Sequence, residues 1–308
     1  MQYASKTQFA TQSNVLGTPV NVLSFVEAQD RVLAWGQARE SRYVVLANVH
    51  VVVTAAREPD FGAVVAAADL ATPDGAPVAW MLRKLGHAGQ ERVSGPDLTW
   101  ALLARCAAEG LPVYFFGSSR ETLGLLAERI NAAFPALVVA GFEAPPFRPM
   151  TPAEDAEAVA RINASGAGLV FVGLGCPKQE HWMLAHRGQV NAVMLGVGAA
   201  FDFHAGTVSR APTWMREHGL EWLHRLASEP RRLWRRYLVT NTLFVLGAAR
   251  QLLGAWWVNE RPVNSGIVRA AHQACTTNMM RRALEKMVAQ FAEVLSGVWG
   301  GETAINLI

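Results

Sequence analysis

The sequence predicts an α/β fold: a Rossmann-like, mostly parallel sheet with helices on both faces. Short runs of β-branched and aromatic residues alternate with longer helical patterns, which is the rhythm of strands joined by helical crossovers. The runs are apolar throughout, as strands buried on both faces require. The 308 residues are 51% hydrophobic and 17% charged, which supplies a buried core and argues against intrinsic disorder.

Six strands are expected along the chain, with helices between them. The strands are residues 44–53, 64–68, 113–116, 137–141, 169–173 and 192–197. Two helix starts have capping-box spacing, Ser118 with Glu121 and Thr151 with Glu154. After the first of them, apolar residues fall on one helical face, as in a helix packed on a sheet: Leu123, Leu126, Ala127, Ile130 and Phe134.

The pattern changes near residue 210, and three segments are expected. Residues 1–208 form the α/β catalytic domain, 209–250 a basic helical appendage rich in arginine and tryptophan, and 251–308 a helical extension to which we assign no role. Between Arg210 and Arg250 there are eight arginines against three glutamates, so the basic character of the chain belongs to the appendage. An amphipathic helix is expected over residues 283–295.

Several features favour a cytoplasmic location. Residues 1–20 lack the basic and apolar regions of a secretion signal. The longest apolar stretch, residues 237–257, is interrupted by Asn241 and Arg250 and is a poor membrane-spanning helix. The three cysteines are odd in number and widely scattered, which fits a reducing compartment: Cys106, Cys176 and Cys275.

Polar and charged residues follow several expected strands, where ligands bind in open α/β sheets. Asn48 offers an amide to a sugar hydroxyl, or is a buried asparagine bonded to backbone. Asp74, within Thr72-Pro73-Asp74-Gly75, suits a general base that deprotonates an acceptor hydroxyl, although Pro-Asp-Gly is also a common turn. Both interpretations stay open for each residue.

Three further positions are candidates for contacts with substrate. Arg92 precedes a Gly-Pro helix start, which suits a diphosphate, or it is an ordinary exposed arginine. Gly173 and Gly175 let the backbone approach a ligand, and Gln179 follows them with an amide for a ribose, sugar or uracil group. Asp202 lies between aromatic residues and either holds a sugar or caps the turn that closes the domain.

Missing motifs narrow the mechanism. The sequence has no D-x-D pair to present a metal ion to a nucleotide diphosphate, and no H-E-x-x-H, G-x-S-x-G or Walker A motif. Residues 173–178 and 196–201 both miss the third glycine of a dinucleotide fingerprint, which argues against a nicotinamide cofactor. We therefore expect no metal and no cofactor.

Several motifs in fixed order resemble the WecG/TagA/CpsF family of glycosyltransferases over about residues 15–245. They are LANVH, ATPDGAPVAW, ERVSGPDL, YFFGSS, VGLGCPKQE, GVGAAFDFHAG and RAPTWMREHGLEWLHRLASEPRRLWRRYL. The resemblance implies an inverting, metal-independent transfer of a sugar from a UDP-sugar to an undecaprenyl-diphosphate-linked sugar. Such a reaction belongs to the synthesis of exopolysaccharide, capsule or cell-wall polymer.

The resemblance also implies roles for the candidate residues. Asp74 looks like the catalytic base, Arg92 and Gln179 like donor or diphosphate contacts, and Asn48 like part of the same pocket. The other substrate-binding candidates are Thr72, Gly75, Gly173, Gly175 and Asp202. Leu46 departs from the pattern, because some members carry a threonine two residues before the asparagine.

The family has a C-terminal appendage that touches the membrane, and residues 214–237 resemble it. Arginine attracts anionic headgroups, and tryptophan and tyrosine prefer the interface. This implies a peripheral protein at the inner face of the plasma membrane, although a basic helix solvated on one face explains the same pattern. The expected membrane-binding residues are Arg216, Arg225, Arg231, Arg232, Arg235 and Arg236.

Two other function classes remain as alternatives at this stage. One is a nucleotide-dependent oxidoreductase, suggested by the glycine loops after strands. The other is a non-catalytic module that binds membranes through the Arg/Trp segment; nucleic acid is not an expected partner. The sequence leaves open the donor sugar, the acceptor, the polymer and any homo-oligomer.

Overall fold

The computed structural model describes residues 11–217 and 219–260. The expected helix over residues 283–295 lies outside these. The chain divides into two compact units between Phe244 and Val245, and the sheet described below belongs to the first. The segment boundaries near 208 and 250 stay predictions.

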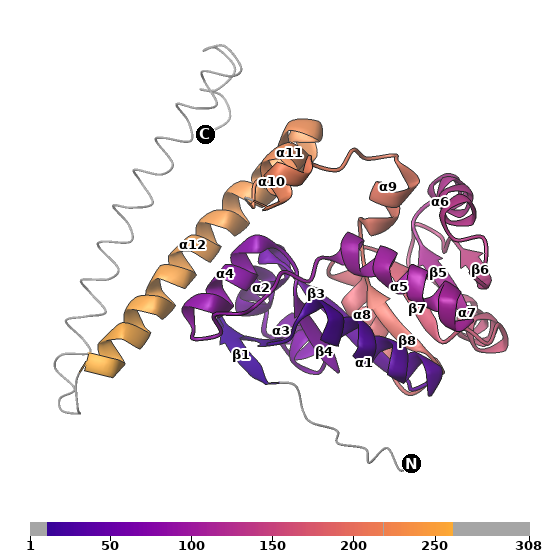
Figure 1. The fold of residues 1–308 in the computed structure, drawn as a ribbon, viewed down its shortest axis with the longest axis horizontal. Coiled ribbons are helices and arrows are strands. Elements are labelled where there is room, and N and C mark those ends of the chain that lie inside the picture. Colours follow the sequence, from indigo (N-terminus) through magenta and orange to yellow (C-terminus); the bar gives the residue numbers. More distant parts are fainter. Residues whose placement is uncertain (1–10, 218, 261–308) are drawn as a thin grey trace. The chain divides into compact units, whose positions relative to one another are not determined.

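A six-stranded parallel sheet forms the centre of the first unit (Figure 1). The strands of the chain are β1 (Gln12–Val15), β2 (Thr18–Asn21), β3 (Arg42–Ala47), β4 (Leu70–Pro73), β5 (Val113–Gly117), β6 (Val139–Glu143), β7 (Leu169–Gly173) and β8 (Val193–Gly196). In the sheet the order is β4-β3-β8-β7-β5-β6, with every neighbouring pair parallel. The predicted parallel sheet is confirmed.

Helices cover both faces of this sheet. The helices of the described residues are α1 (Phe25–Gln37), α2 (Val49–Arg57), α3 (Pro59–Ala66), α4 (Ala76–Lys84), α5 (Gly95–Glu109), α6 (Arg120–Ala133), α7 (Pro152–Ala164), α8 (Lys178–His186), α9 (Ala200–Ala205), α10 (Thr213–Glu217), α11 (Glu221–Ser228) and α12 (Pro230–Glu260). Helices α1, α5, α6 and α9 contact one another, and α2, α3 and α8 form a second group. Helix α7 joins the second group through a Trp182–Asp155 hydrogen bond of 3.0 Å. The connection after β3 leads to β4 at one edge of the sheet, and the connection after β5 leads to β6 at the other edge. Because crossovers between parallel strands are right-handed, connections that run in opposite directions place their helices on opposite faces.

The core of the sheet is aromatic. Phe115 on β5 stacks on Phe142 of β6 and Phe171 of β7, and it meets Phe201 of α9 edge-on. Phe115, Phe171 and Phe201 are all fully buried. This cluster fixes the helix layer on one face of the sheet, because close packing of large rings leaves little freedom for sliding.

Two strand predictions differ from the structure. The expected strand at 64–68 is wrong. Residues 64–66 end α3, residues 67 and 68 lie in the loop after it, and the strand in this region is β4, which begins at Leu70. Pro59 begins α3, and Phe61, Val64 and Val65 bury one helical face, so the apolar run has helical spacing. The expected strand at 44–53 stops at Ala47, because the Asn48 side chain caps α2.

The other expected strands and caps fit closely. Strands β5, β7 and β8 match their predictions, and β6 lies two residues further along. Thr151 and Glu154 form the predicted capping box of α7. The cap of α6 is Ser119 rather than Ser118, because Ser118 has a positive φ of 61° and donates its N–H to the Gly173 carbonyl at 3.0 Å.

The connections reverse direction between β5 and β7. The chain leaves β5 outward to β6, and it leaves β7 inward to β8, so the reversal falls at the carboxyl ends of these two neighbours. Gly117 and Gly173 pair in register there. Gly117 has φ 126°, and an added Cβ would lie 2.5 Å from the Gly173 carbonyl carbon, so only glycine fits.

Candidate active site

Asp74 lies directly after β4 and beside Asn48, which follows the neighbouring strand β3. The parallel register pairs Leu46 with Thr72 and Ala47 with Pro73, so the next residues meet at the same sheet edge. The Asn48 amide donates to Asp74 Oδ2 at 3.4 Å. Its Oδ1 accepts from the Val51 N–H at 3.2 Å and so caps α2. One asparagine therefore begins a helix and orients the carboxylate.

The start of α5 forms the other side of the carboxylate. The Gly95 N–H donates to Asp74 Oδ1 at 3.4 Å. A Cβ on Gly95 would lie 2.7 Å from Leu46 Cδ1, so glycine allows α5 to approach this closely. A helix N-terminus favours a negative charge, so this contact stabilises the ionised form of Asp74.

Burial dominates the ionisation of Asp74. Loss of solvent raises its pKa to about 6, and the nearby Glu221 carboxylate adds to the rise. The Arg92 guanidinium and the hydrogen bonds from Asn48 and Gly95 lower the pKa. A carboxylate with a pKa near 6 is mostly ionised at neutral pH yet accepts a proton more readily than an exposed aspartate.

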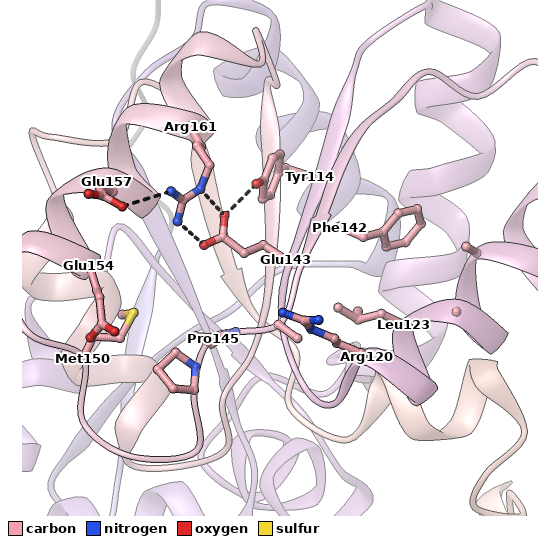
Figure 2. A pocket seen from close by; sticks show the side chains of 14 residues that line it. Tyr114, Arg120, Leu123, Phe142, Glu143, Pro145, Met150, Glu154, Glu157 and Arg161 are labelled. Atoms are coloured by element: carbon pink, nitrogen blue, oxygen red, sulfur yellow. Dashed lines mark hydrogen bonds and ion pairs between the residues drawn. The ribbon is translucent and has the colours of Figure 1, made fainter.

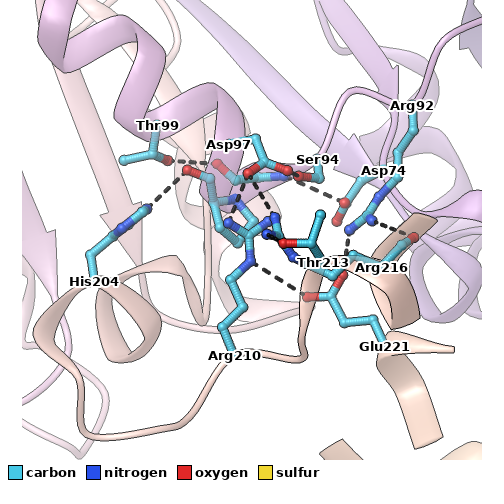
Figure 3. Close-up of polar contacts among 12 residues, drawn as sticks. Asp74, Arg92, Ser94, Asp97, Thr99, His204, Arg210, Thr213, Arg216 and Glu221 are labelled. Atoms are coloured by element: carbon cyan, nitrogen blue, oxygen red, sulfur yellow. Dashed lines mark hydrogen bonds and ion pairs between the residues drawn. The ribbon is translucent and has the colours of Figure 1, made fainter. Parts of the chain in front are cut away.

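Arg92 approaches the same site from the loop before α5 (Figure 3). Its Nη2 lies 2.5 Å from Oε2 of Glu221, at the start of α11, and its Nη1 donates to the Arg216 carbonyl at 3.4 Å. Arg92 and Glu221 are both largely buried, with side-chain exposures of 22% and 17%. Elements more than 100 residues apart thus meet beside Asp74.

Asp97 gathers a second set of charges in the first turns of α5 (Figure 3). Its carboxylate accepts from the Ser94 hydroxyl and lies 2.7 Å from Arg210 Nη1 and 3.6 Å from Arg216 Nη1. These contacts lower the pKa of Asp97 despite its partial burial. Asp97 is therefore a structural anion held by two arginines.

Guanidinium nitrogens without partners collect around these acids. Among the buried guanidinium nitrogens of the described residues that have no hydrogen-bond acceptor are Arg92 Nε, Arg210 Nε, Arg210 Nη2, Arg216 Nε and Arg225 Nε. A buried donor without a partner costs about 1–3 kcal/mol, and more when it is charged. Their concentration in one place indicates an anionic ligand.

Gln179 and the two glycines lie at the neighbouring strand ends. The Gln179 amide donates to the Gly196 carbonyl at 3.0 Å and to Glu180 at 2.9 Å, and its Oε1 accepts from the Gly175 N–H at 3.2 Å. The side chain therefore braces the loops after β7 and β8 from a buried position. In this structure its amide contacts the protein's own groups.

The remaining predicted residues have mainly local contacts. The Asp202 carbonyl accepts from the backbone N–H groups of residues 206–208 and ends α9. Thr72 is fully buried, and its Oγ1 has no partner within the described part of the chain. Gly75 begins α4 with φ 99°, a conformation that favours glycine. The structure thus brings Asn48, Asp74 and Arg92 together and places the others around them.

The six arginines expected at the membrane do not share one environment. Arg216 and Arg225 are half-buried; the first contacts Thr213 Oγ1 at 3.0 Å, and the second lies over the Phe203 ring at 5.2 Å. Arg236 is also half-buried. Burial lowers the pKa of His50 to about 4, and the positive charge of Arg236 contributes to this lowering. Arg231 and Arg235 are exposed, and the side chain of Arg232 is not among those that the structure describes.

A separate cavity of about 670 Å³ lies at the opposite edge of the sheet (Figure 2). Tyr114, Arg120, Phe142, Glu143 and Arg161 are among its lining residues, and Glu143 accepts from the Tyr114 hydroxyl at 2.9 Å and from Arg161 at 2.7 Å. Strand β6 lies five positions from β4, about 24 Å at the usual strand spacing. The cavity is therefore distinct from the Asp74 site.

Sequence reasoning missed Asp97, Arg210 and Glu221 as site residues. Asp97 stands in the ERVSGPD motif, and the other two stand in the RAPTW…GLEW segment, so the motif order contained a signal. Asp97 is on α5, Arg210 precedes α10 and Glu221 is on α11. Their pairing was not visible in the sequence, because residue spacing shows only neighbours on one element.

The fold and site together define an α/β enzyme that holds a basic carboxylate beside a cluster of arginines. The chain belongs to the glycosyl transferase WecG/TagA/CpsF family, whose sequence model matches residues 13–257. It is also 31% identical over 227 residues to an N-acetylglucosaminyldiphosphoundecaprenol N-acetyl-β-D-mannosaminyltransferase of Bacillus spizizenii. That match covers 71% of this chain and 86% of the relative. The protein is accordingly a glycosyltransferase, and the oxidoreductase alternative is set aside.

Two surveys of the described residues complete the picture. Among them, no helix combines the length and apolarity needed to cross a membrane. In the same residues, histidine, cysteine and acidic side chains nowhere gather in threes as a candidate metal site.

Proposed function

We propose that this glycosyltransferase moves a sugar from a UDP-sugar to a sugar carried on undecaprenyl diphosphate, with inversion at the anomeric carbon and without a metal ion. The reaction would serve synthesis of exopolysaccharide, capsule or a cell-wall polymer. The name of the Bacillus relative supports the lipid-linked acceptor. The observation that carries the mechanism is Asp74: a largely desolvated carboxylate, held by Asn48 and Gly95, beside Arg92.

The transfer is a single displacement in this proposal. The acceptor hydroxyl gives its proton to Asp74 while its oxygen forms a bond to the anomeric carbon. The bond from that carbon to the donor's phosphate oxygen breaks, and its electron pair leaves with UDP. Arg92 neutralises the charge that develops on the leaving diphosphate. Asn48 and Gly95 hold the carboxylate in place for the incoming hydroxyl.

Purified full-length protein provides the direct test. With a synthetic prenyl-diphosphate sugar as acceptor and a panel of UDP-sugars, one donor is expected to give acceptor-dependent UDP release. EDTA at millimolar concentration should leave that rate unchanged, because the arginines take the charge of the leaving group. Release that ignores the acceptor, or that EDTA abolishes, contradicts the proposal.

The acceptor's lipid stays in the bilayer, so the enzyme has to come to the inner face of the membrane. Arg231 and Arg235 are exposed at the start of α12, and Arg235 lies over the Trp234 ring at 5.1 Å. Exposed cations beside an aromatic ring suit anionic headgroups and the interface. We therefore assign membrane contact to these exposed residues first.

Charge reversal at both positions should separate membrane binding from chemistry. Arg231→Glu with Arg235→Glu is expected to release the protein from anionic vesicles, since each cation near the surface contributes about 1 kcal/mol. Activity on a short-chain, water-soluble acceptor should persist. Arg57→Glu with Arg120→Glu, two exposed arginines outside this segment, is the matched control. If the two double variants float with anionic vesicles to the same extent, the assignment of membrane contact to Arg231 and Arg235 is refuted.

A further inference from the structure

Arg210 carries an unused hydrogen-bonding edge beside the candidate active site. It lies between α9 and α10, and its side chain is 22% exposed. Nη1 is 2.7 Å from Asp97 Oδ1, so one side of the guanidinium is anchored. Nε and Nη2, which form the opposite side, are buried and have no hydrogen-bond partner among the described residues.

That edge has the geometry of a phosphate-binding fork. The Nε–H and Nη2–H bonds of arginine are parallel and match two oxygens of one phosphate. Leaving both donors buried and unsatisfied is costly, so an unused pair indicates a missing acceptor. An ion pair with Asp97 alone would require only Nη1, and it would not explain why the other edge is turned inward.

Unfilled hydrogen-bond donors on two arginines lie in the same neighbourhood. Glu221 lies between the two arginines, with Oε2 2.5 Å from Arg92 Nη2 and Oε1 4.0 Å from Arg210 Nε (Figure 3). It therefore aligns both guanidinium groups and still leaves Arg92 Nε and the Arg210 edge without acceptors. Both arginines thus offer donors to a ligand group with several acceptor oxygens.

We propose that Arg210 binds the diphosphate of the sugar donor through its Nε and Nη2 atoms, opposite Arg92, with Asp97 and Glu221 as positioning residues. The inference rests on the proposed function and adds a donor-binding residue from outside the α/β core. During transfer Arg210 would hold the phosphate oxygens that gain charge as the anomeric bond breaks. The segment before α10 is then part of the donor site.

Lysine at position 210 is the sharpest test, because it keeps the charge and removes the planar fork. Calorimetry with UDP should show affinity lower by roughly 10- to 100-fold in Arg210→Lys, as expected for losing charge-assisted hydrogen bonds. Uridine, which has no phosphates, should bind as it does to the wild type. Arg210→Met, without the charge, should lose at least as much. Arg148→Lys, an exposed arginine near the opposite sheet edge, is the control.

The outcomes distinguish this inference from the proposed donor class. Wild-type UDP affinity in both Arg210 variants, with melting temperatures that show a folded protein, would overturn the inference and leave the transfer reaction standing. If the wild type binds ADP or GDP in preference to UDP, the donor class is wrong, and the same variants measured with that nucleotide still decide the role of Arg210. Failure of the wild type to bind any nucleoside diphosphate or pyrophosphate would overturn the site itself.

Discussion

Asp74→Asn lowers turnover by roughly 10²- to 10⁴-fold, the contribution of a positioned general base. Asparagine keeps the size of the side chain but has a single acceptor oxygen, so it keeps at most one of the hydrogen bonds from Asn48 and Gly95. It also cannot take a proton from the acceptor hydroxyl. UDP affinity should hardly change, because the carboxylate acts on the acceptor. Acceptor-dependent UDP release and calorimetry measure the two effects. Asp60→Asn, an exposed acid on α3, should behave as the wild type.

The pH dependence and the stability of Asp74→Asn follow from the same carboxyl group. Burial raises its pKa to about 6 from an ordinary 3.8, so wild-type turnover should fall below pH 6 as the base becomes protonated. The folded state holds this proton more tightly than the unfolded state, so stability is lost as pH rises from 3.8 through about 6. The change in melting temperature on going to asparagine should therefore be more favourable at pH 8 than at pH 3.5. Wild-type turnover in the variant would exclude Asp74 as the base.

Much of this site follows from strand register. The sequence pointed to the carboxyl ends of parallel strands as the place where ligands bind, but it put Asn48 inside the expected strand 44–53 and Asp74 six residues beyond the expected strand 64–68. The structure shows β3 and β4 as neighbours and joins the two side chains by a hydrogen bond. The exact placement depended on the end of β3 at Ala47 and on β4 at Leu70–Pro73, which the residue pattern did not predict.

Other features depended on geometry that sequence patterns do not contain. The β1–β2 hairpin turns at Leu16 and Gly17, which have φ values of 53° and 90°. Leucine rarely adopts such a conformation, so no turn signal was present. Arg210, Glu221 and Asp97 likewise resemble ordinary surface charges in sequence, and only the packed structure shows that they face one another.

The basic segment divides into two groups of arginines in the structure. Arg210 and Arg216 are half-buried beside Asp97, and Arg225 is half-buried over the Phe203 ring, whereas Arg231 and Arg235 are exposed. Under the proposed function, one stretch of sequence would supply both cations for an anionic substrate and cations for a membrane surface. Charge counting along the chain could not separate them, because burial decides which role each arginine has.

Arg92 should rank second to Asp74 in its effect on the reaction. Arg92→Lys keeps the charge but loses the planar donor geometry, and turnover should fall by roughly 10²- to 10³-fold, as when one donor to a developing negative charge is removed. Turnover in Arg92→Met should fall further, because this substitution also leaves Glu221 buried without its closest cation. Steady-state rates with saturating acceptor measure both. Arg57→Lys on the exposed end of α2 is the control.

The pH profiles of these variants separate a role in chemistry from a role in packing. Arg92 lowers the pKa of Asp74 and Glu221 raises it, so Arg92→Met removes the lowering charge and exposes Asp74 to an unpaired carboxylate. The acid limb of its rate profile should therefore shift to higher pH, whereas Arg92→Lys, with a cation still present, should keep the limb near pH 6. Identical limbs in both variants would contradict an electrostatic effect of the Arg92 charge on Asp74. A shift confined to the methionine variant would show that the positive charge at position 92, directly or by neutralising Glu221, keeps the base ionised, as the proposed transfer demands.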